Sequence, residues 1–237
     1  MLARLVEKSV EGSVRGRDKV AVAFSGGLDS SVLAVCARRF TEVVACSAAS
    51  PGAADHGRAA AAARGIGLEV VETGLSKATV MKALGEMDLP FEPALMDKSL
   101  WCLYYLVSKS AAEAGAKVIL LGQLSDELFG GYSKYEKEYA SGSGRAESMM
   151  SADVALYEAK GRLRDLSACE KWLPAGFPFE EREIVEFGLS LPITYKLRDG
   201  VRKAVLRRAA LILGVPETLA NAPKKAAQYS SGIQKLL

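Results

Sequence analysis

Residues 20–31 read Val-Ala-Val-Ala-Phe-Ser-Gly-Gly-Leu-Asp-Ser-Ser, and this stretch decides the fold. The apolar run 20–24 predicts a short buried strand, and residues 30–39 predict a helix. Gly26 and Gly27 stand between them, where adjacent glycines allow a tight turn and a close approach to a ligand. The sequence therefore predicts a strand, a glycine-rich turn and the beginning of a helix.

The turn at residues 25–31 predicts a phosphate site. The first N–H groups of a helix have no internal partner, and the helix dipole is positive at that end. Ser25, Ser30 and Ser31 add hydroxyl donors without adding charge. Asp29 fits such a site when a cation joins it to phosphate oxygens, as Mg²⁺ does. The spacing is neither Walker A nor Gly-x-Gly-x-x-Gly, and an ordinary turn of small residues is the simpler interpretation.

Short aliphatic strands alternate with helices in the first 140 residues. The predicted strands are 20–24, 42–47, 68–73 and 117–122, and the predicted helices are 50–64, 76–86 and 99–114. This alternation predicts an α/β fold, a parallel sheet with helices on both faces. Ligands bind at the carboxyl ends of the strands in such sheets, and the glycine-rich turn follows such an end.

A second motif, Gly-Gln-Leu-Ser-Asp-Glu-Leu-Phe-Gly-Gly-Tyr at residues 122–132, follows another predicted strand. Its Asp126 is expected near Asp29, because both follow strands that end at the same edge of the sheet. Two carboxylates at one point repel each other unless a divalent cation lies between them. The alternative is an acidic helix start, with Asp126 as a cap and Glu127 favouring the dipole.

The composition fits one large domain, or a core with a helical extension, with 237 residues of which 49% are hydrophobic. The net charge of +3 is only mildly basic and does not indicate a nucleic-acid-binding face. No apolar run reaches the ~18 residues that a membrane span needs. The first eight residues predict an amphipathic helix and lack a signal-peptide core.

Four isolated cysteines and one histidine limit the metal chemistry. Cys36, Cys46, Cys102 and Cys169 lie in apolar surroundings without a Cys-x-x-Cys pair, so buried free thiols and a reducing cytoplasm are expected. A zinc or iron–sulfur site is not expected. His56, at the start of an alanine-rich helix, favours a surface or capping role. Proton transfer then falls to carboxylates, lysine, tyrosine or the substrate.

Small polar residues at 141–145, Ser-Gly-Ser-Gly-Arg, predict a mobile linker that closes over the site on substrate binding. Helices are predicted after it, at 147–172, 180–191 and 200–213. We therefore expect a single domain over residues 1–237, with an α/β nucleotide-binding core at about 17–140 and a helical part at about 145–237.

The motif at 25–31 resembles the pyrophosphate loop of the N-type ATP pyrophosphatases (PP-loop, adenine nucleotide alpha hydrolase-like). With the motif at 125–132, it is similar to the synthetase domain of the glutamine-dependent asparagine synthetases and β-lactam synthetases. Residues 177–186 resemble the family's Pro-Phe-Leu-Asp-Arg-Glu-Phe-Val-Glu segment. Three further segments resemble the family's Leu-Pro, Lys-x-x-Leu-Arg and Arg-Pro-Lys elements, in that order: Leu191-Pro192, Lys203–Arg207 and Ala222-Pro223-Lys224.

The resemblance implies that a carboxylate attacks the α-phosphate of ATP, pyrophosphate leaves, and a nitrogen nucleophile then displaces AMP to form an amide. It places Ser25, Gly26, Gly27, Asp29, Ser30 and Ser31 at the pyrophosphate. Asp29 and Asp126 fall on Mg²⁺ ligands, and the backbone around residues 44–47, including Ser47, and at Leu121 and Gly122 resembles the adenine-binding edge. Lys224 matches a lysine that stabilises charge during adenylation and amide formation, a role suited to a compact cation. Lys225 is the alternative for this role, and Lys203 is a further candidate for binding phosphate.

Three positions depart from the family's pattern. Residue 2 is Leu where a glutaminase half has a cysteine nucleophile, so nitrogen is expected from ammonia, another amine or a separate glutaminase subunit. Gln123 replaces a glutamate linked to the incoming nitrogen or the amino-acid substrate, and an amide cannot accept a proton as a base. Ala222 replaces the arginine of Arg-Pro-Lys. The nucleotide half of the reaction is thus better specified than the acceptor half.

The first hypothesis is an AMP-forming amide synthetase that takes a small carboxylate and ammonia or an amine. A tRNA-modifying ATP pyrophosphatase is a second hypothesis, and the cluster Arg202, Lys203, Arg207 and Arg208 is compatible with it. A third is an ATP-binding subunit that needs a partner such as a glutaminase. Neither a membrane nor a nucleic acid is expected as partner, and a homo-oligomer is left open.

Overall fold

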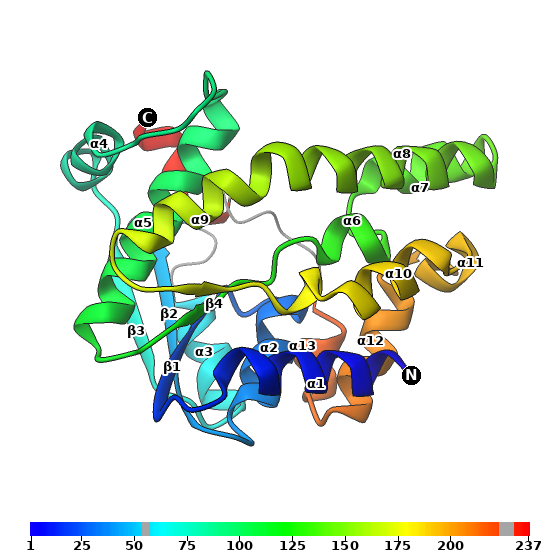
Figure 1. The fold of residues 1–237 in the computed structure, drawn as a ribbon, viewed down its shortest axis with the longest axis horizontal. Helices are drawn as coiled ribbons and strands as arrows, with labels where there is room; N and C mark the ends of the chain where they lie inside the picture. The colour runs from blue at the N-terminus through cyan, green and yellow to red at the C-terminus, as the bar shows by residue number, and fades with distance from the viewer. Residues whose placement is uncertain (54–56, 223–229) are drawn as a thin grey trace.

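The computed structural model describes residues 1–53, 57–222 and 230–237 (Figure 1). Its centre is a parallel sheet of five strands in the order β3-β2-β1-β4-β5. The strands are β1 Lys19–Ala23, β2 Glu42–Ala49, β3 Val70–Gly74, β4 Ile119–Leu120 and β5 Ala175–Gly176. The predicted α/β fold with a parallel sheet is confirmed, and the four predicted strands are found with shifted ends.

Helices make up most of the rest of the described chain. Up to β4 they are α1 Leu2–Val14, α2 Leu28–Ala37, α3 Arg58–Gly65, α4 Lys77–Gly85 and α5 Leu95–Glu113. Between β4 and β5 lie α6 Ser125–Phe129, α7 Ser133–Ala140, α8 Ser143–Leu156, a π-helical turn Tyr157–Gly161 and α9 Arg162–Glu170. After β5 come α10 Arg182–Ser190, α11 Ile193–Lys196, α12 Ala204–Ile212, α13 Glu217–Ala220 and the 3₁₀ turns Pro178–Glu180 and Ile233–Leu236.

Both faces of the sheet are covered, and β1 shows why. Successive side chains of a strand point to opposite faces. Val20 and Val22 pack into a core with residues of α1, α2 and α12, whereas Ala21 packs with residues of α5 and α9 on the other face. Figure 1 shows α1 and α2 on one side of the sheet and α5 and α9 on the other. These three residues of β1 have no exposed surface. A strand buried on both faces explains the continuous apolar run in the sequence.

The order of the strands places a crevice at the end of β1. The chain runs outward from β1 to β2 and β3 on one side and to β4 and β5 on the other. Ligands bind in open α/β sheets at the carboxyl ends of the strands where the order reverses in this way. The turns after β1 and β4, which carry the two sequence motifs, therefore lie beside each other.

Two predicted elements differ from the structure. The predicted linker 141–145 is wrong beyond Gly142, since α8 begins at Ser143, and the buried Ala146 and Met150 pack this helix against Tyr135 and Ile193. Packing of this kind overrides the weak helix propensity of serine and glycine. The predicted helix 50–64 also starts late, because Pro51 and Gly52 form a turn and the described helix begins at Arg58.

The helical prediction after residue 145 also missed a strand. Ala175–Gly176 adds β5 to the edge of the sheet beside β4, with Ile119 paired to Ala175 and Leu120 to Gly176. A strand of two residues is too short to produce a period-two pattern. Residues from both halves of the chain therefore build one sheet.

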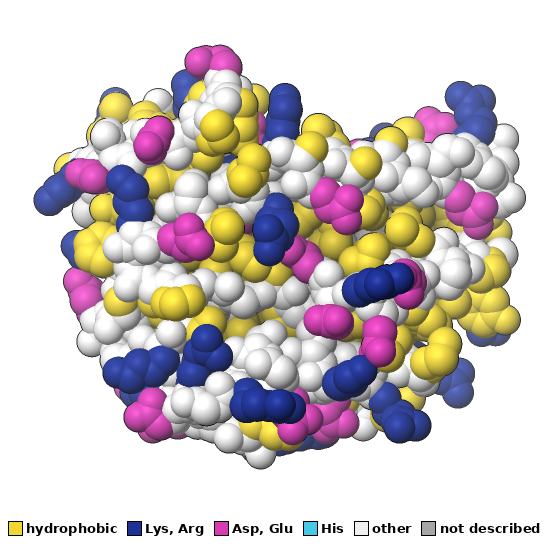
Figure 2. Space-filling model, in the orientation of Figure 1, with side chains coloured by type: hydrophobic (Ala, Val, Ile, Leu, Met, Phe, Trp, Pro, Cys, Tyr) yellow, Lys and Arg dark blue, Asp and Glu magenta, His cyan; other side chains and the backbone are white. Residues whose placement is uncertain are grey.

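The amphipathic helix predicted at the start of the chain is confirmed as α1. Its Leu2, Val6, Val10 and Val14 are buried in the core that also contains α2. Over the described residues, no helix is both long and apolar enough to cross a bilayer. Lys/Arg and Asp/Glu side chains are interspersed on the face drawn in Figure 2.

A buried lysine at the end of α11 gives a testable pH effect on stability. Lys196 is 2% exposed, and burial lowers its pKa from 10.5 to about 8, against the opposing charge of Glu147. The unfolded chain therefore binds more protons between about pH 8 and 10.5, and this group makes stability rise with pH across that window. We expect Lys196→Met to stabilise the fold at pH 7 by about 1 kcal/mol, with the gain shrinking towards pH 10.5.

Urea unfolding of wild type and variant at several pH values measures this difference. Lys137→Met serves as the control, because Lys137 is exposed and its replacement is expected to leave stability unchanged at every pH. A gain for Lys196→Met that stays constant with pH would contradict the assignment of a lowered pKa to Lys196.

Candidate functional site

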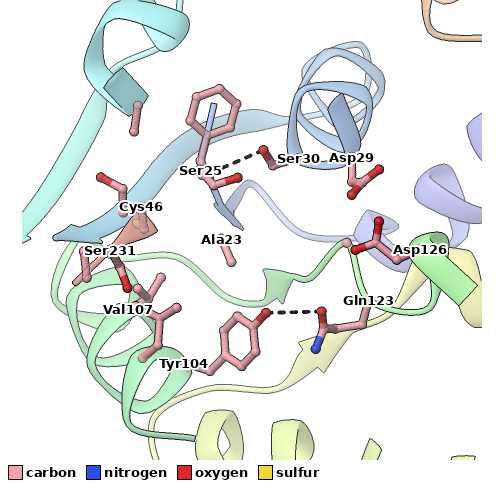
Figure 3. Close-up of a pocket in the computed structure, with 16 residues that line it drawn as sticks. Ala23, Ser25, Asp29, Ser30, Cys46, Tyr104, Val107, Gln123, Asp126 and Ser231 are labelled. Atoms are coloured by element: carbon pink, nitrogen blue, oxygen red, sulfur yellow. Dashed lines mark hydrogen bonds between the residues drawn. The ribbon is translucent and has the colours of Figure 1, made fainter. Parts of the chain in front are cut away.

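A cavity of about 110 Å³ opens at the carboxyl ends of β1, β2 and β4 (Figure 3). Its polar lining comes from both sequence motifs and from the end of β2. These residues are Ser25, Asp29, Ser30, Ser47, Gln123 and Asp126. Helix α5 contributes Leu103, Tyr104 and Val107, and Ser231 comes from the C-terminal segment. The cavity therefore has polar groups on the sheet edge and an apolar wall on α5.

The glycine-rich turn holds its shape through contacts with α3. Gly26 has φ +68°, and a Cβ added there would lie 2.9 Å from the Cβ of Ala62. The Arg58 guanidinium donates to the carbonyl of Ser25 at 2.9 Å. Ser30 Oγ accepts from the Ser25 amide at 3.3 Å and donates to the carbonyl of Gly27 at 3.2 Å. The turn thus requires glycine at residue 26 and is tied to its neighbours.

The second motif approaches the first through another glycine. A Cβ added to Gly122 would lie 3.0 Å from the Cβ of Asp29, so the end of β4 passes directly beside the turn after β1. Leu124 adopts the left-handed conformation, with φ +68°, at the N-cap of α6. Such a conformation costs free energy outside glycine and occurs often at functional sites. It directs α6 so that Asp126 points towards Asp29 (Figure 3).

Lys203 lies between the two carboxylates. Its Nζ is 2.7 Å from Asp29 Oδ1 and 2.7 Å from Asp126 Oδ1, and it donates to Ser125 Oγ at 2.8 Å. The predicted convergence of Asp29 and Asp126 is therefore present, with an ammonium group between them. The competing interpretation of Asp126 as a helix cap is not borne out, because α6 has no side-chain cap hydrogen bond at its N-cap.

Glu127 faces away from this pair and into the protein. Its Oε1 accepts a hydrogen bond from the Tyr132 hydroxyl at 2.7 Å, and the residue is buried. Burial raises the pKa of Glu127, and the negative charge of Asp126 raises it further. Burial also raises the pKa of Tyr132 well above its usual value. These two residues form a structural pair behind the site.

Gln123 is held from both ends of its amide. Its Nε2 donates to Asp165, and its Oε1 accepts from the Tyr104 hydroxyl at 3.2 Å (Figure 3). Asp165 has no exposed surface, and burial raises its pKa, although Arg164 and Gln123 oppose this. The amide thus presents its oxygen beside the cavity and its nitrogen to a buried carboxylate.

Arg164 completes the network behind Gln123. Its Nε donates to Asp165 Oδ1 at 2.8 Å, and its Nη1 donates to Asp97 Oδ1 at 3.0 Å. Burial acts to lower the pKa of Arg164, but the two aspartates outweigh burial and raise it. The π-helical turn Tyr157–Gly161 directly precedes this segment, and such turns occur frequently at functional sites.

The structure brings together most of the predicted site residues that it describes. Ser25, Asp29, Ser30, Ser47, Gly122, Gln123 and Asp126 line the cavity, and Lys203 lies behind the two aspartates. Gly26 and Gly27 shape the turn without lining the cavity. Ser31 and Leu121 are fully buried and are absent from the lining. Lys224, Lys225 and His56 lie outside the described residues.

Sequence reasoning missed Tyr104, Arg164 and Asp165. Tyr104 lies within the apolar helix α5, where an aromatic residue is typical of a core position. Arg164 and Asp165 lie in α9 among charged residues, which is typical of an exposed face, yet both are buried. The adjacent Arg-Asp pair lies inside the predicted helix 147–172, where the sequence offers no further signal for this network.

The four cysteines are buried free thiols, as predicted. Burial raises the pKa of each of Cys36, Cys46, Cys102 and Cys169 to about 12. At neutral pH they therefore remain protonated, and protonated thiols are poor nucleophiles.

The residues present fit a nucleotide with a divalent cation. Ser47 Oγ is buried in the cavity wall without a hydrogen-bond partner among the described residues, so a ligand at this edge would find an available polar group. Asp29 and Asp126 already share one cation, Lys203 Nζ. The described residues contain no cluster of three metal-ligating side chains. Two carboxylates suit Mg²⁺, which commonly takes one or two carboxylates together with phosphates and water.

Comparisons with known proteins agree with this geometry. The chain matches the family described as asparagine synthase over residues 1–177 and 164–236. The candidate glutamine-hydrolyzing asparagine synthetase 1 of Methanocaldococcus jannaschii is 31% identical over 277 aligned positions, covering 100% of this chain and 50% of that protein. Asparagine synthetase domain-containing protein 1 of Mus musculus is 30% identical, covering 60% of this chain and 25% of that protein. The chain thus spans half or less of the length of these relatives.

A solved structure of NMN synthetase from Francisella tularensis has the same fold. It superposes with a TM-score of 0.51 at 12% identity and covers 98% of this chain and 78% of that chain. The fold is adenine nucleotide alpha hydrolase-like. The family match spans nearly the whole chain, and members of this family use ATP. The chain therefore belongs to the asparagine synthase family, and its fold and motifs are those of an asparagine-synthase-like ATP pyrophosphatase domain.

Proposed function

We propose that the protein is an ATP-dependent, AMP-forming amide synthetase. A carboxylate oxygen attacks the α-phosphorus of ATP, the bond from that phosphorus to the α,β-bridging oxygen breaks, and pyrophosphate leaves with its electron pair. Ammonia or an amine then attacks the acyl carbon, AMP leaves, and one proton is released. The observation that carries the proposal is the meeting of Asp29 and Asp126 on one cation beside the N-terminus of α2.

The turn Ser25–Ser30 is proposed to hold the phosphates. Backbone N–H groups at the start of α2 and the positive end of its dipole favour an anion there. Gly26 lies so close to α3 that residue 26 has no room for a side chain, so this part of the turn presents only backbone. The adenine is proposed to lie near Ser47, where Cys46 and Ala48 form the cavity wall and Ser47 Oγ is available.

Asp29 and Asp126 are proposed to hold Mg²⁺ with the nucleotide. When bound, Mg²⁺ lowers the negative charge on the phosphate oxygens and favours the departure of pyrophosphate. The 14% and 18% exposure of Asp126 and Asp29 supports this role, because a partly buried pair interacts strongly with a cation. Lys224 remains a proposed catalytic residue by its match to the family motif, and its position is outside the described residues.

Gln123 is proposed to orient the acceptor or the incoming nitrogen. Its Oε1 can accept a hydrogen bond but cannot remove a proton at neutral pH. The contact of Nε2 with Asp165 supports a fixed amide, since a flip would point a carbonyl oxygen at a carboxylate. The proton released in amide formation therefore leaves by another group, the phosphate or solvent. Free ammonia, an amine, or ammonia from a separate glutaminase are the candidate nitrogen sources.

A carboxylate-dependent exchange between ATP and labelled pyrophosphate tests the first half-reaction. This assay needs no amine, so it separates the acceptor from the nitrogen source. We expect exchange with Mg²⁺, ATP and one member of a panel of amino-acid carboxylates that includes L-aspartate, and AMP with amide formation once ammonium is added. Asp126→Asn is expected to lower the exchange rate at least about 100-fold, because one metal ligand is lost.

Asp88→Asn is the matched control, since Asp88 lies outside the cavity and is no part of the two motifs. Formation of ADP and phosphate in place of AMP and pyrophosphate would contradict the proposal. Equal exchange rates for Asp126→Asn and wild type would remove Asp126 from the proposed metal site while leaving the adenylation itself intact.

Gln123→Glu tests whether Asp165 excludes a carboxylate from residue 123. The new side chain would lie against a fully buried carboxylate, which raises its pKa in the folded protein. Relative to wild type, the variant is then least destabilised at low pH, and the deficit grows as pH rises from about 4 through the raised pKa of the introduced carboxyl group. We expect a loss of about 2 kcal/mol or more at pH 7.

Denaturant unfolding between pH 4 and 8 measures this effect. Gln123→Met lacks the charge but also loses the hydrogen bond that lowers the pKa of Asp165, so its penalty should change less with pH than that of Gln123→Glu. Equal stability of Gln123→Glu and wild type at pH 7, with better use of L-aspartate, would show that Asp165 does not disfavour a glutamate here.

A further inference from the structure

Lys203 is buried more deeply than the two carboxylates that it contacts. Its side chain is 3% exposed, against 18% for Asp29 and 14% for Asp126. Nζ lies 2.7 Å from an oxygen of each carboxylate and 2.8 Å from Ser125 Oγ. The ammonium thus donates to Asp29 and Ser125 and forms an ion pair with Asp126, and it lies at the meeting point of the predicted metal ligands.

The fold specifies the position of Lys203. The residue has φ +57° and ψ 33° at the N-cap of α12, a backbone conformation that is strained for residues other than glycine. The hairpin of β6 Leu197–Arg198 and β7 Val201–Arg202 leads directly into it. Arg202 anchors the hairpin by donating to the carbonyl of Gly131 at 3.0 Å and pairing with Glu136 at 3.3 Å.

The space around the ion pair is closed on the side of Gly131. A Cβ added to Gly131 would lie 2.6 Å from Lys203 Cε and would overlap Asp126. Asp126 and Lys203 therefore have no room to part in that direction. The open side is the cavity, which Asp29 and Asp126 both line.

Two cations cannot occupy this point together. An ammonium at 2.7 Å from both carboxylates and a divalent cation bound to the same oxygens would repel each other strongly at this burial. Without any cation, the two carboxylates would repel each other. One cation at a time is the arrangement that satisfies both conditions.

We propose that Lys203 is the resident counter-ion of Asp29 and Asp126, and that it leaves them when a nucleotide-bound divalent cation enters. The inference rests on the proposed metal site. It adds an order of binding, in which the divalent cation comes with the nucleotide and not before it. A divalent cation alone must first displace Lys203, which lowers its apparent affinity. When the nucleotide is bound, its phosphate oxygens can pair with the displaced Lys203 ammonium, because the lysine side chain is flexible.

Direct binding of Mn²⁺, followed by electron paramagnetic resonance, tests this order without measuring activity. Without nucleotide, we expect Lys203→Met to bind Mn²⁺ at least about tenfold more tightly than wild type, because no ammonium competes. The analogue α,β-methylene-ATP cannot release pyrophosphate, because a methylene group replaces the α,β-bridging oxygen. With this analogue, wild type should bind Mn²⁺ tightly, and the higher Mn²⁺ affinity of the variant should disappear. Lys196→Met, which removes another buried lysine of the same region, should match wild type in both conditions.

Thermal unfolding is the second measurement, and it covers the case of a poorly folded variant. Lys203→Met leaves two carboxylates without their cation, so Mn²⁺ alone should raise its Tm while leaving the Tm of wild type unchanged. Lys203→Gln, which keeps a hydrogen-bond donor, repeats the test where the methionine variant does not fold. Wild-type binding of Mn²⁺ alone as tight as that of the Lys203 variants would overturn the inference. Absence of Mn²⁺ binding to every form, with nucleotide present, would instead overturn the proposed metal site.

Discussion

The repulsion between Asp29 and Asp126 is the constraint on which the site depends. They come from turns about 100 residues apart, after β1 and β4, which a parallel sheet places side by side. A cation must lie between them, and Lys203 supplies it from a third segment, at the start of α12. The glycine-rich turn, the second motif and the C-terminal helices are thereby joined at one buried point. Its position at the order reversal of the sheet is also where an α/β fold opens a crevice.

Much of the nucleotide half could be predicted from the sequence, because its determinants are local. The apolar run of β1 and the glycine at residue 26 follow from periodicity and from backbone conformation, and both are found. The role of Lys203 could be suggested only through a motif, since its contacts join residues 174 positions apart. β5 could not be predicted, because two residues carry no pattern, and the first turn of α8 could not, because packing of Ala146 and Met150 overrides its serine and glycine.

The surroundings of Gln123, in the proposed acceptor half of the site, could not be predicted from the sequence for a different reason. Gln123 is a departure from the family's glutamate, and the sequence alone suggests a tuned or weakened site. Its amide donates to the fully buried Asp165, and a glutamate at this position would place two carboxylates in contact. The partner is 42 residues away in a helix rich in charge, where exposure is the ordinary expectation. The glutamine at residue 123 is therefore understood only together with its contact with Asp165.

The two halves of the site handle charge in opposite ways. On the proposed nucleotide side, Asp29 and Asp126 border the cavity, and their counter-ion is the lysine proposed to give way to a divalent cation. On the proposed acceptor side, Arg164 is held between Asp97 and Asp165, and Gln123 is neutral and held at both ends. In the proposed reaction, a nucleotide that brings its own cation suits the first arrangement, because charge would enter and leave with each turnover. The proposed acceptor carboxylate loses its charge on joining AMP, and the neutral amide of Gln123, held at both ends, adds no charge beside it.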